Sequence, residues 1–234
     1  MSEAARARAE DYASFNEFFT RALKPGVRPI AEGSDSIVAP CDGTLTEFGT
    51  LEHESMLQAK GMTYSLAALL GEGAPDAEAF IDGSYATIYL APRDYHRVHT
   101  PVAGRLLRAR YIPGDRYSVS AATARAISNL FCRNERVVCW LEAEFGRVAV
   151  VLVGALNVSS ISITGRGEIP SGPAHTWQTS EPTRLPKGAE LGRFNLGSTV
   201  IALFPRGTMR FEGRLARGER VLMGALIGRT LPTP

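Results

Sequence analysis

Short runs of β-branched and aromatic residues, separated by turns, recur along most of this chain. Residues 85–90, 136–141 and 147–153 are such runs, and the last two flank Glu144-Phe145-Gly146, a pattern that predicts a β-hairpin. The sequence has no internal repeat and no regular alternation of strands with helices, which a parallel sheet would need. It therefore predicts an α+β fold dominated by β-structure, with mostly antiparallel sheets and short peripheral helices.

Other segments are interpreted from their composition. Residues 121–131 are expected to be helical, and residues 200–204 and 220–226 to be the strands that close the chain. Residues 170–188 are rich in Pro, Gly, Ser and Thr, which predicts a long surface loop. Asp42-Gly43 lies between two strand-like runs and predicts a turn.

The N-terminal segment predicts one short amphipathic helix. Ser14 and Glu17 have the spacing of a capping box, and three phenylalanines follow at helical spacing before Pro25-Gly26 ends the helix. The aromatic face either docks on the protein's own core or contacts a membrane surface or an entering substrate. We expect residues 1–30 to form an N-terminal amphipathic helix and linker, and residues 31–234 to form the main domain.

Composition excludes several classes of protein. A formal charge of +2 without a basic stripe argues against a nucleic-acid partner. No apolar run reaches the roughly 18 residues of a membrane span, and the polar N-terminus does not resemble a secretory signal. Cys41, Cys132 and Cys139 are odd in number and lack CxxC spacing, which favours buried thiols in a reduced, cytosolic compartment.

Two of the four histidines, His96 and His99, lie in one short polar segment that ends at Pro101. Histidines three residues apart can bind a metal ion on a helix, but Pro101 argues against a helix and no third ligand is near, so no metal site is expected. The two rings either serve one pocket in different roles or are ordinary core or surface histidines.

Asp42, His99 and Ser198 follow one another in sequence order, and this set suggests a carboxylate, a general base and a hydroxyl nucleophile. The G-x-S-x-G and S-x-x-K signatures of serine hydrolases are missing. Gly197 directly precedes Ser198 and lacks a Cβ, so its carbonyl can be approached closely. The pattern therefore favours a serine that acts on its own Gly197 carbonyl.

Several short segments of the chain match one known family: residues 15–21 with 27–30; Ala39-Pro40-Cys41-Asp42-Gly43; Gln58-Ala59-Lys60-Gly61 with 64–66; residues 129–131 with 133–136; Asp94-Tyr95-His96-Arg97-Val98-His99; and Gly192-Arg193-Phe194 with Leu196-Gly197-Ser198-Thr199. Through these segments, and most specifically through the last two, the chain resembles the phosphatidylserine decarboxylases of the bacterial and mitochondrial type from about Phe15 to the C-terminus.

This resemblance implies a proenzyme that processes itself. Asp42 and His99 would activate Ser198, whose Oγ attacks the Gly197 carbonyl. The resulting ester would break by β-elimination to dehydroalanine, which hydrolyses to a pyruvoyl group with loss of ammonia. Residues 1–197 would become the β chain, and residues 198–234 the α chain with the pyruvoyl cofactor at position 198.

The resemblance also implies the reaction. The pyruvoyl group would form a Schiff base with the amine of phosphatidylserine and act as the electron sink for its decarboxylation to phosphatidylethanolamine and CO2. His96 would return a proton to the Cα. Residues 31–234 would then be the catalytic domain of a homodimeric protein bound peripherally to an anionic membrane surface, on the cytoplasmic face of the cell membrane.

Three other interpretations of the sequence remain open. The first is a Ser-His-Asp esterase with a free Ser198. The second is a non-enzymatic, β-rich lipid-binding or carrier module with an inert Gly-Ser turn. The third is a related decarboxylase for a small soluble amino acid, because the sequence does not spell out a phospholipid pocket.

Overall fold

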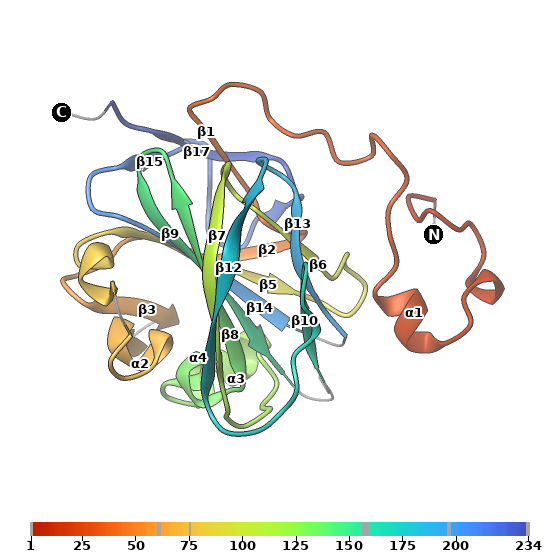
Figure 1. Ribbon diagram of the computed structural model, residues 1–234, viewed down its shortest axis with the longest axis horizontal. Helices are drawn as coiled ribbons and strands as arrows, with labels where there is room; N and C mark the ends of the chain where they lie inside the picture. The colour runs from red at the N-terminus through yellow and green to blue at the C-terminus, as the bar shows by residue number, and fades with distance from the viewer. Residues whose placement is uncertain (1, 60–61, 75, 156–159, 196–197, 233–234) are drawn as a thin grey trace.

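A computed structural model describes residues 2–59, 62–74, 76–155, 160–195 and 198–232 (Figure 1). Its centre is an eight-stranded sheet in which neighbouring strands pair antiparallel, in the order β12-β7-β8-β9-β14-β5-β2-β16. In that order the strands span His175–Leu185, Gly104–Ile112, Arg136–Ala143, Gly146–Gly154, Ser198–Phe204, Ser84–Leu90, Gly43–Thr50 and Arg220–Val221. The predicted β-dominated, antiparallel architecture is confirmed, and so is the β8–β9 hairpin.

Three smaller sheets accompany the central one. Their orders are β1-β17-β15, β11-β10-β13-β6 and β3-β4. Their strands span, in chain order, Ser36–Val38 (β1), Ser55–Ala59 (β3), Met62–Ser65 (β4), Arg97–His99 (β6), Ile161–Ile163 (β10), Gly167–Glu168 (β11), Glu190–Phe194 (β13), Met209–Phe211 (β15) and Leu226–Thr230 (β17). In the second of these sheets, β6 ends at His99 and β13 ends four residues before Ser198.

The helices are short. They are α1 (Phe15–Phe19), α2 (Leu66–Leu70), α3 (Ala121–Ala126) and α4 (Leu130–Arg133), with 3-10 turns at Ala9–Asp11 and Ala77–Phe80. Serine hydroxyls at Ser14, Ser65 and Ser120 accept a backbone N–H at the starts of α1, α2 and α3. In Figure 1, α2 lies at one side of the sheets and α1 stands out at the opposite side with the N-terminus.

The two faces of the central sheet bury two separate hydrophobic clusters. Along β14, Val200 and Ala202 belong to one cluster, and Ile201 and Leu203 belong to the other. This alternation follows from the two-residue period of a strand. Strand β14 is therefore buried on both faces, and its first residue, Ser198, shares a face with Val200.

Three sequence expectations are wrong. Most of the predicted loop at 170–188 is the edge strand β12, which pairs only with β7 among the described strands, so exposed polar residues suit it. Asp42-Gly43 is not a hairpin turn, because β1 pairs with β17 whereas β2 pairs with β5 and β16. The expected strand at 220–226 is two strands, β16 and the start of β17, in different sheets.

Two helix predictions need a smaller adjustment. The predicted helix at 121–131 is divided into α3 and α4, because Asn129 between them adopts the left-handed backbone conformation with φ 55°. Helix α1 begins as predicted but ends at Phe19. Within the described residues, no helix is long and apolar enough to span a bilayer, and the three cysteines are free thiols.

Candidate active site

Backbone hydrogen bonds bring the predicted site segments together. The amide of His99 donates to the carbonyl of Pro40, two residues before Asp42, at 2.7 Å. The amide of Phe194, four residues before Ser198, donates to the carbonyl of His96 at 3.0 Å. Segments that are far apart in the sequence therefore meet where β6, β13 and the start of β14 lie.

Ser198 is the first residue of β14 and pairs with Leu90 on one side and Gly154 on the other. Its side chain is fully buried, and its Oγ has no hydrogen-bond partner among the described residues. A buried hydroxyl without a partner is uncommon in native proteins. The other half of the predicted cleavage site, Gly197, lies outside the described residues.

His96 precedes β6 and is fully buried. Its Nδ1 lies 2.9 Å from the Asp94 carbonyl, and because a carbonyl only accepts, Nδ1 carries the proton and Nε2 the lone pair. No partner contacts Nε2 within the described part of the chain. The ring packs on Phe19 of α1 at a centroid distance of 3.9 Å, and burial lowers the pKa of His96 to about 4. His96 is therefore a neutral imidazole with one free basic nitrogen.

His99 has both ring nitrogens occupied. Nδ1 donates to the Gly188 carbonyl at 2.8 Å, so Nε2 accepts the hydroxyl of Tyr95 at 3.0 Å. Burial lowers the pKa of His99 and raises that of Tyr95 to about 12, which keeps the phenol protonated as the donor. For His99 to accept a proton from another group, the Tyr95 hydroxyl first has to leave Nε2.

Asp42 is held by Arg28 instead of by a histidine. Its carboxylate accepts from Arg28 Nε at 2.9 Å, from Arg28 Nη2 at 2.6 Å and from the Met223 amide at 2.9 Å. Arg28 Nη2 also binds Glu3 at 2.8 Å. A direct Asp42–His99 hydrogen bond is absent from the described contacts, although the charge of Asp42 slightly raises the pKa of both His96 and His99.

Further contacts fix the segment that leads into His96. The Asp94 carboxylate accepts from the Ala91 amide at 2.8 Å and forms an ion pair with Arg220 at 2.9 Å. Arg21 donates to the Asp94 carbonyl at 3.4 Å. The segment is thus anchored to the N-terminal region and to β16, which fixes the orientation of the His96 ring.

A cavity of about 310 Å³ lies next to Ser198, on the other face of β14. It is lined by Thr199, whose buried Oγ1 also has no partner among the described residues, together with Tyr89, Gln58 and Phe131. The mixed polar and apolar lining suits an amphiphilic ligand. In the described residues, no group of three or more His, Cys, Asp or Glu side chains gathers as a metal site would require.

Sequence reasoning missed three residues of this site. Arg28 holds Asp42, Tyr95 occupies His99, and Phe19 covers His96. Two signals were available, because Tyr95 lies in the segment that contains both histidines and Phe19 belongs to the predicted aromatic helix face. The partner of Arg28 depends on the tertiary fold, which no local pattern reveals.

Comparisons with known proteins show the family of this chain. The family model described as phosphatidylserine decarboxylase matches residues 15–229. A relative from Methylibium petroleiphilum is 48% identical, with 96% of this chain and 80% of the relative covered. One from Shewanella woodyi is 50% identical (89% and 75% covered), and one from Vibrio cholerae is 48% identical (96% and 81%). All three are named phosphatidylserine decarboxylase proenzyme, and the chain belongs to the phosphatidylserine decarboxylase family.

Proposed function

We propose that this protein is a proenzyme that cleaves itself between Gly197 and Ser198 and then decarboxylates phosphatidylserine to phosphatidylethanolamine and CO2. Family membership supports the activity. The observation that carries the proposal for this chain is the hydroxyl of Ser198, which is buried at the start of a core strand without a hydrogen-bond partner among the described residues. A serine that serves only as a turn residue would be exposed or hydrogen-bonded.

In the cleavage step, Ser198 Oγ attacks the Gly197 carbonyl while a base takes its proton. His99 is the proposed base, and release of its Nε2 by the Tyr95 hydroxyl is the step that makes it available. Burial lowers the pKa of His99, and the negative charge of Asp42 opposes this in part by favouring the protonated imidazole. Arg28 fixes the position of that charge.

The residues around Ser198 fit a pyruvoyl group derived from it. The Oγ atom has no partner to lose among the described residues, and the backbone on its C-terminal side is fixed by pairing with β5 and β9. The group would supply a ketone carbonyl that accepts the electrons released when the substrate loses CO2. The buried surroundings exclude water, which favours loss of a carboxylate.

His96 is the proposed proton donor to the substrate Cα. Its Nδ1–H is committed to the Asp94 carbonyl, so the proton is taken up and returned at Nε2. Burial lowers the pKa of His96 to about 4, so the resting ring is neutral, and Nε2 would first take up a proton from the ammonium group of the substrate before it returns one to the Cα. Phe19 limits the orientations open to the ring.

The two chains produced by cleavage would stay together. Strand β14 of the α chain lies between β5 and β9 of the β chain, with backbone pairing along its length on both sides. Strand β17 also pairs with β1, and β16 with β2. We further propose a homodimer that binds peripherally to the cytoplasmic face of the cell membrane, at an anionic surface, where the exposed Phe15 of α1 can contact lipid.

Denaturing electrophoresis and the intact mass of the products test the self-cleavage. The wild-type protein should give fragments 1–197 and 198–234, the second with a blocked N-terminus of pyruvoyl mass. Ser198→Ala should remain full length, and His99→Ala should cleave far more slowly. A wild-type chain that stays intact after long incubation would refute the proposal.

Decarboxylation is tested separately, by following phosphatidylethanolamine formation from phosphatidylserine vesicles with mass spectrometry. His96→Ala should cleave normally yet lose turnover, and retained turnover would remove His96 from the role of proton donor. Free serine as substrate is the control for the substrate class, and its rapid decarboxylation would indicate a soluble amino-acid substrate instead.

A further inference from the structure

A second cavity, of about 390 Å³, lies between the N-terminal segment and the sheet that contains β6 and β13. Four arginines line it, together with a single carboxylate, Glu17. The arginines are Arg6 and Arg21 from the N-terminal segment, Arg97 from β6 and Arg193 from β13. Neutral polar side chains of Tyr12, Ser14, Asn16 and Thr20 complete the lining. Four guanidinium groups gathered in one cavity favour an anionic ligand there.

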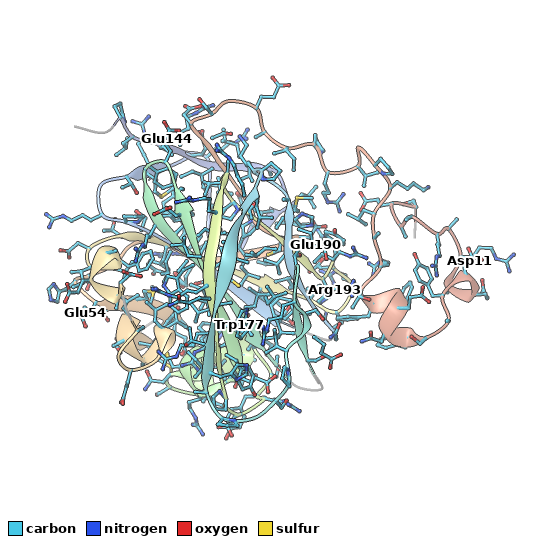
Figure 2. The ribbon with its side chains drawn as sticks, viewed as in Figure 1. Asp11, Glu54, Glu144, Trp177, Glu190 and Arg193 are labelled. Carbon is cyan, nitrogen blue, oxygen red and sulfur yellow. The ribbon has the colours of Figure 1, made fainter. Side chains whose placement is uncertain are left out.

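Arg97 and Arg193 lie directly opposite each other on the antiparallel β6–β13 ladder. Their side chains share one face of the sheet, and like charges in this position repel. Arg97 is balanced by an ion pair with Glu190 at 2.8 Å, and its Nε donates to the Thr20 carbonyl. The side chain of Arg193 is half-buried and, among the described residues, makes neither an ion pair nor a hydrogen bond. Figure 2 shows Arg193 and Glu190 on the side of the sheets that faces the N-terminal segment.

The other two arginines are only partly neutralised. Arg6 pairs with Glu17 at 2.6 Å. Arg21 donates to the carbonyls of Arg93 and Asp94 and stacks on Phe18, without a carboxylate among its described partners. Two carboxylates partly neutralise these four arginines: Glu17, which lines the cavity, and Glu190, which pairs with Arg97. Two positive charges therefore remain uncompensated. Guanidinium groups match the geometry of phosphate oxygens, so the surplus favours a phosphate over a simple halide.

We propose that this cavity binds a phosphate group, with Arg193 as its principal ligand and Arg21 as its second. Helix α1 forms part of the wall and presents Phe15, which is 66% exposed, to the surroundings. An exposed aromatic ring beside a cationic cavity is typical of a protein that binds a lipid surface. We therefore expect the bound phosphate to belong to a lipid headgroup. A soluble phosphate ester has the same chemistry, and the experiment distinguishes the two.

The cavity is coupled to the candidate active site through its walls. Asn16, which lines it, donates to the Asn195 carbonyl at 3.0 Å, three residues before Ser198. Arg21 donates to the same Asp94 carbonyl that fixes His96. A phosphate bound here would order the segment that holds the His96 ring. The binding itself requires neither self-cleavage nor decarboxylation, so it can be tested independently of the proposed function.

The experiment measures binding of the full chain to vesicles that contain no phosphatidylserine, so that no turnover occurs. Vesicles of phosphatidylcholine with and without phosphatidylglycerol form one arm. Glycerol 3-phosphate and inorganic phosphate, read by the shift in melting temperature, form the other. Arg193→Gln should weaken binding in at least one arm by roughly ten- to a hundredfold, the loss of one charge-assisted hydrogen bond. Arg193→Lys should retain part of the binding.

Arg206→Gln is the matched control, because it makes the same change in net charge at a 75% exposed residue outside the cavity. It should leave binding within about twofold of wild type. Arg193→Gln should fold normally, since its loss removes a repulsion and breaks no described hydrogen bond, and an unchanged melting temperature checks this. Weakening confined to vesicles identifies a lipid phosphate, and weakening confined to the soluble esters identifies a free one. The proposal is overturned if neither arm weakens or if both variants weaken equally.

Discussion

The buried contact between Arg28 and Asp42 yields the most quantitative prediction. The two side chains are 6% and 1% exposed, and two guanidinium nitrogens of Arg28 bind the carboxylate. The carboxylates of Asp42 and, second, Glu3 raise the pKa of Arg28, so the arginine is charged at every working pH. The perturbation is Arg28→Met, which keeps an unbranched side chain but removes the charge and the donors.

The expected cost follows from what the substitution leaves behind. In Arg28→Met, Asp42 would remain buried with the Met223 amide as its partner, an almost uncompensated charge. Breaking a buried ion pair in this way costs about 3–5 kcal/mol of the free energy of unfolding. For a chain of this size that corresponds to a fall in melting temperature of roughly 6–20 °C. Because both partners act as one unit, Arg28→Met with Asp42→Asn should cost clearly less than the sum of the single substitutions.

The assay is denaturant unfolding in the Ser198→Ala background, so that every variant is compared as one unbroken chain. Arg229→Met is the control, because its ion pairs with Asp35 and Glu212 lie at the exposed surface and should contribute far less to stability than the buried Arg28–Asp42 pair. Equal losses for Arg28→Met and Arg229→Met, or strict additivity with Asp42→Asn, would refute the reasoning that Arg28 and Asp42 form a coupled, buried ion pair.

Three further predictions concern other buried contacts. Burial lowers the pKa of His96 from 6.5 in the unfolded chain to about 4 in the folded one, so its contribution to stability is lost as the pH falls between those values. His96→Gln should therefore flatten the dependence of the melting temperature on pH over that range. Parallel curves for the variant and the wild type would contradict this. Tyr95→Phe removes the hydroxyl that occupies Nε2 of His99 and should cost about 0.5–1.5 kcal/mol of stability. Self-cleavage, measured by electrophoresis, should be at least as fast as in the wild type. Slower cleavage would show that the hydroxyl is required. Arg136→Met should lower the free energy of unfolding by at least about 3 kcal/mol, because the 3% exposed arginine donates to four backbone carbonyls. Arg136→Lys should restore less than half of the stability that Arg136→Met loses. A loss under about 1 kcal/mol in Arg136→Met would show that those carbonyls find other partners.

The parts of the fold that the sequence predicts are those set by local chemistry. The β8–β9 hairpin has a short turn between two apolar runs, and α1 begins directly after its predicted capping residue, Ser14. Strand β12 is different, since its polar residues form an edge that only β7 stabilises among the described strands. Composition alone does not distinguish such an edge strand from a loop, because the strand it pairs with, β7, is distant in the sequence. Even the pair with the smallest separation, Tyr111 and His175, is 64 residues apart.

The candidate site was predictable as a set of residues but not as a set of contacts. The resemblance selected Asp42, His96, His99 and Ser198, and the backbone hydrogen bonds bring their segments together. The residue set also suggested a carboxylate that acts with the base His99, and the described carboxylate of Asp42 binds Arg28 and the Met223 amide. The choice between these partners is made by tertiary distance and burial, which depend on the N-terminal segment and on β16–β17. The catalytic roles of Asp42, His96, His99 and Ser198 stay predictions.

Three of the unpaired buried atoms support the proposal that this position serves both the cleavage and the cofactor. Native proteins leave few buried polar atoms without a partner, because each costs about 1–3 kcal/mol. In the described residues, Ser198 Oγ, Thr199 Oγ1 and His96 Nε2 all lack one. The cost is tolerable here because β14 is fixed on both sides from its first residue, where Ser198 faces Leu90 and Gly154. Breaking the peptide bond before Ser198 would leave those ladders intact. The new N-terminus would therefore stay in the place where the unpaired hydroxyl now lies, with the free nitrogen of His96 as the group that can exchange a proton.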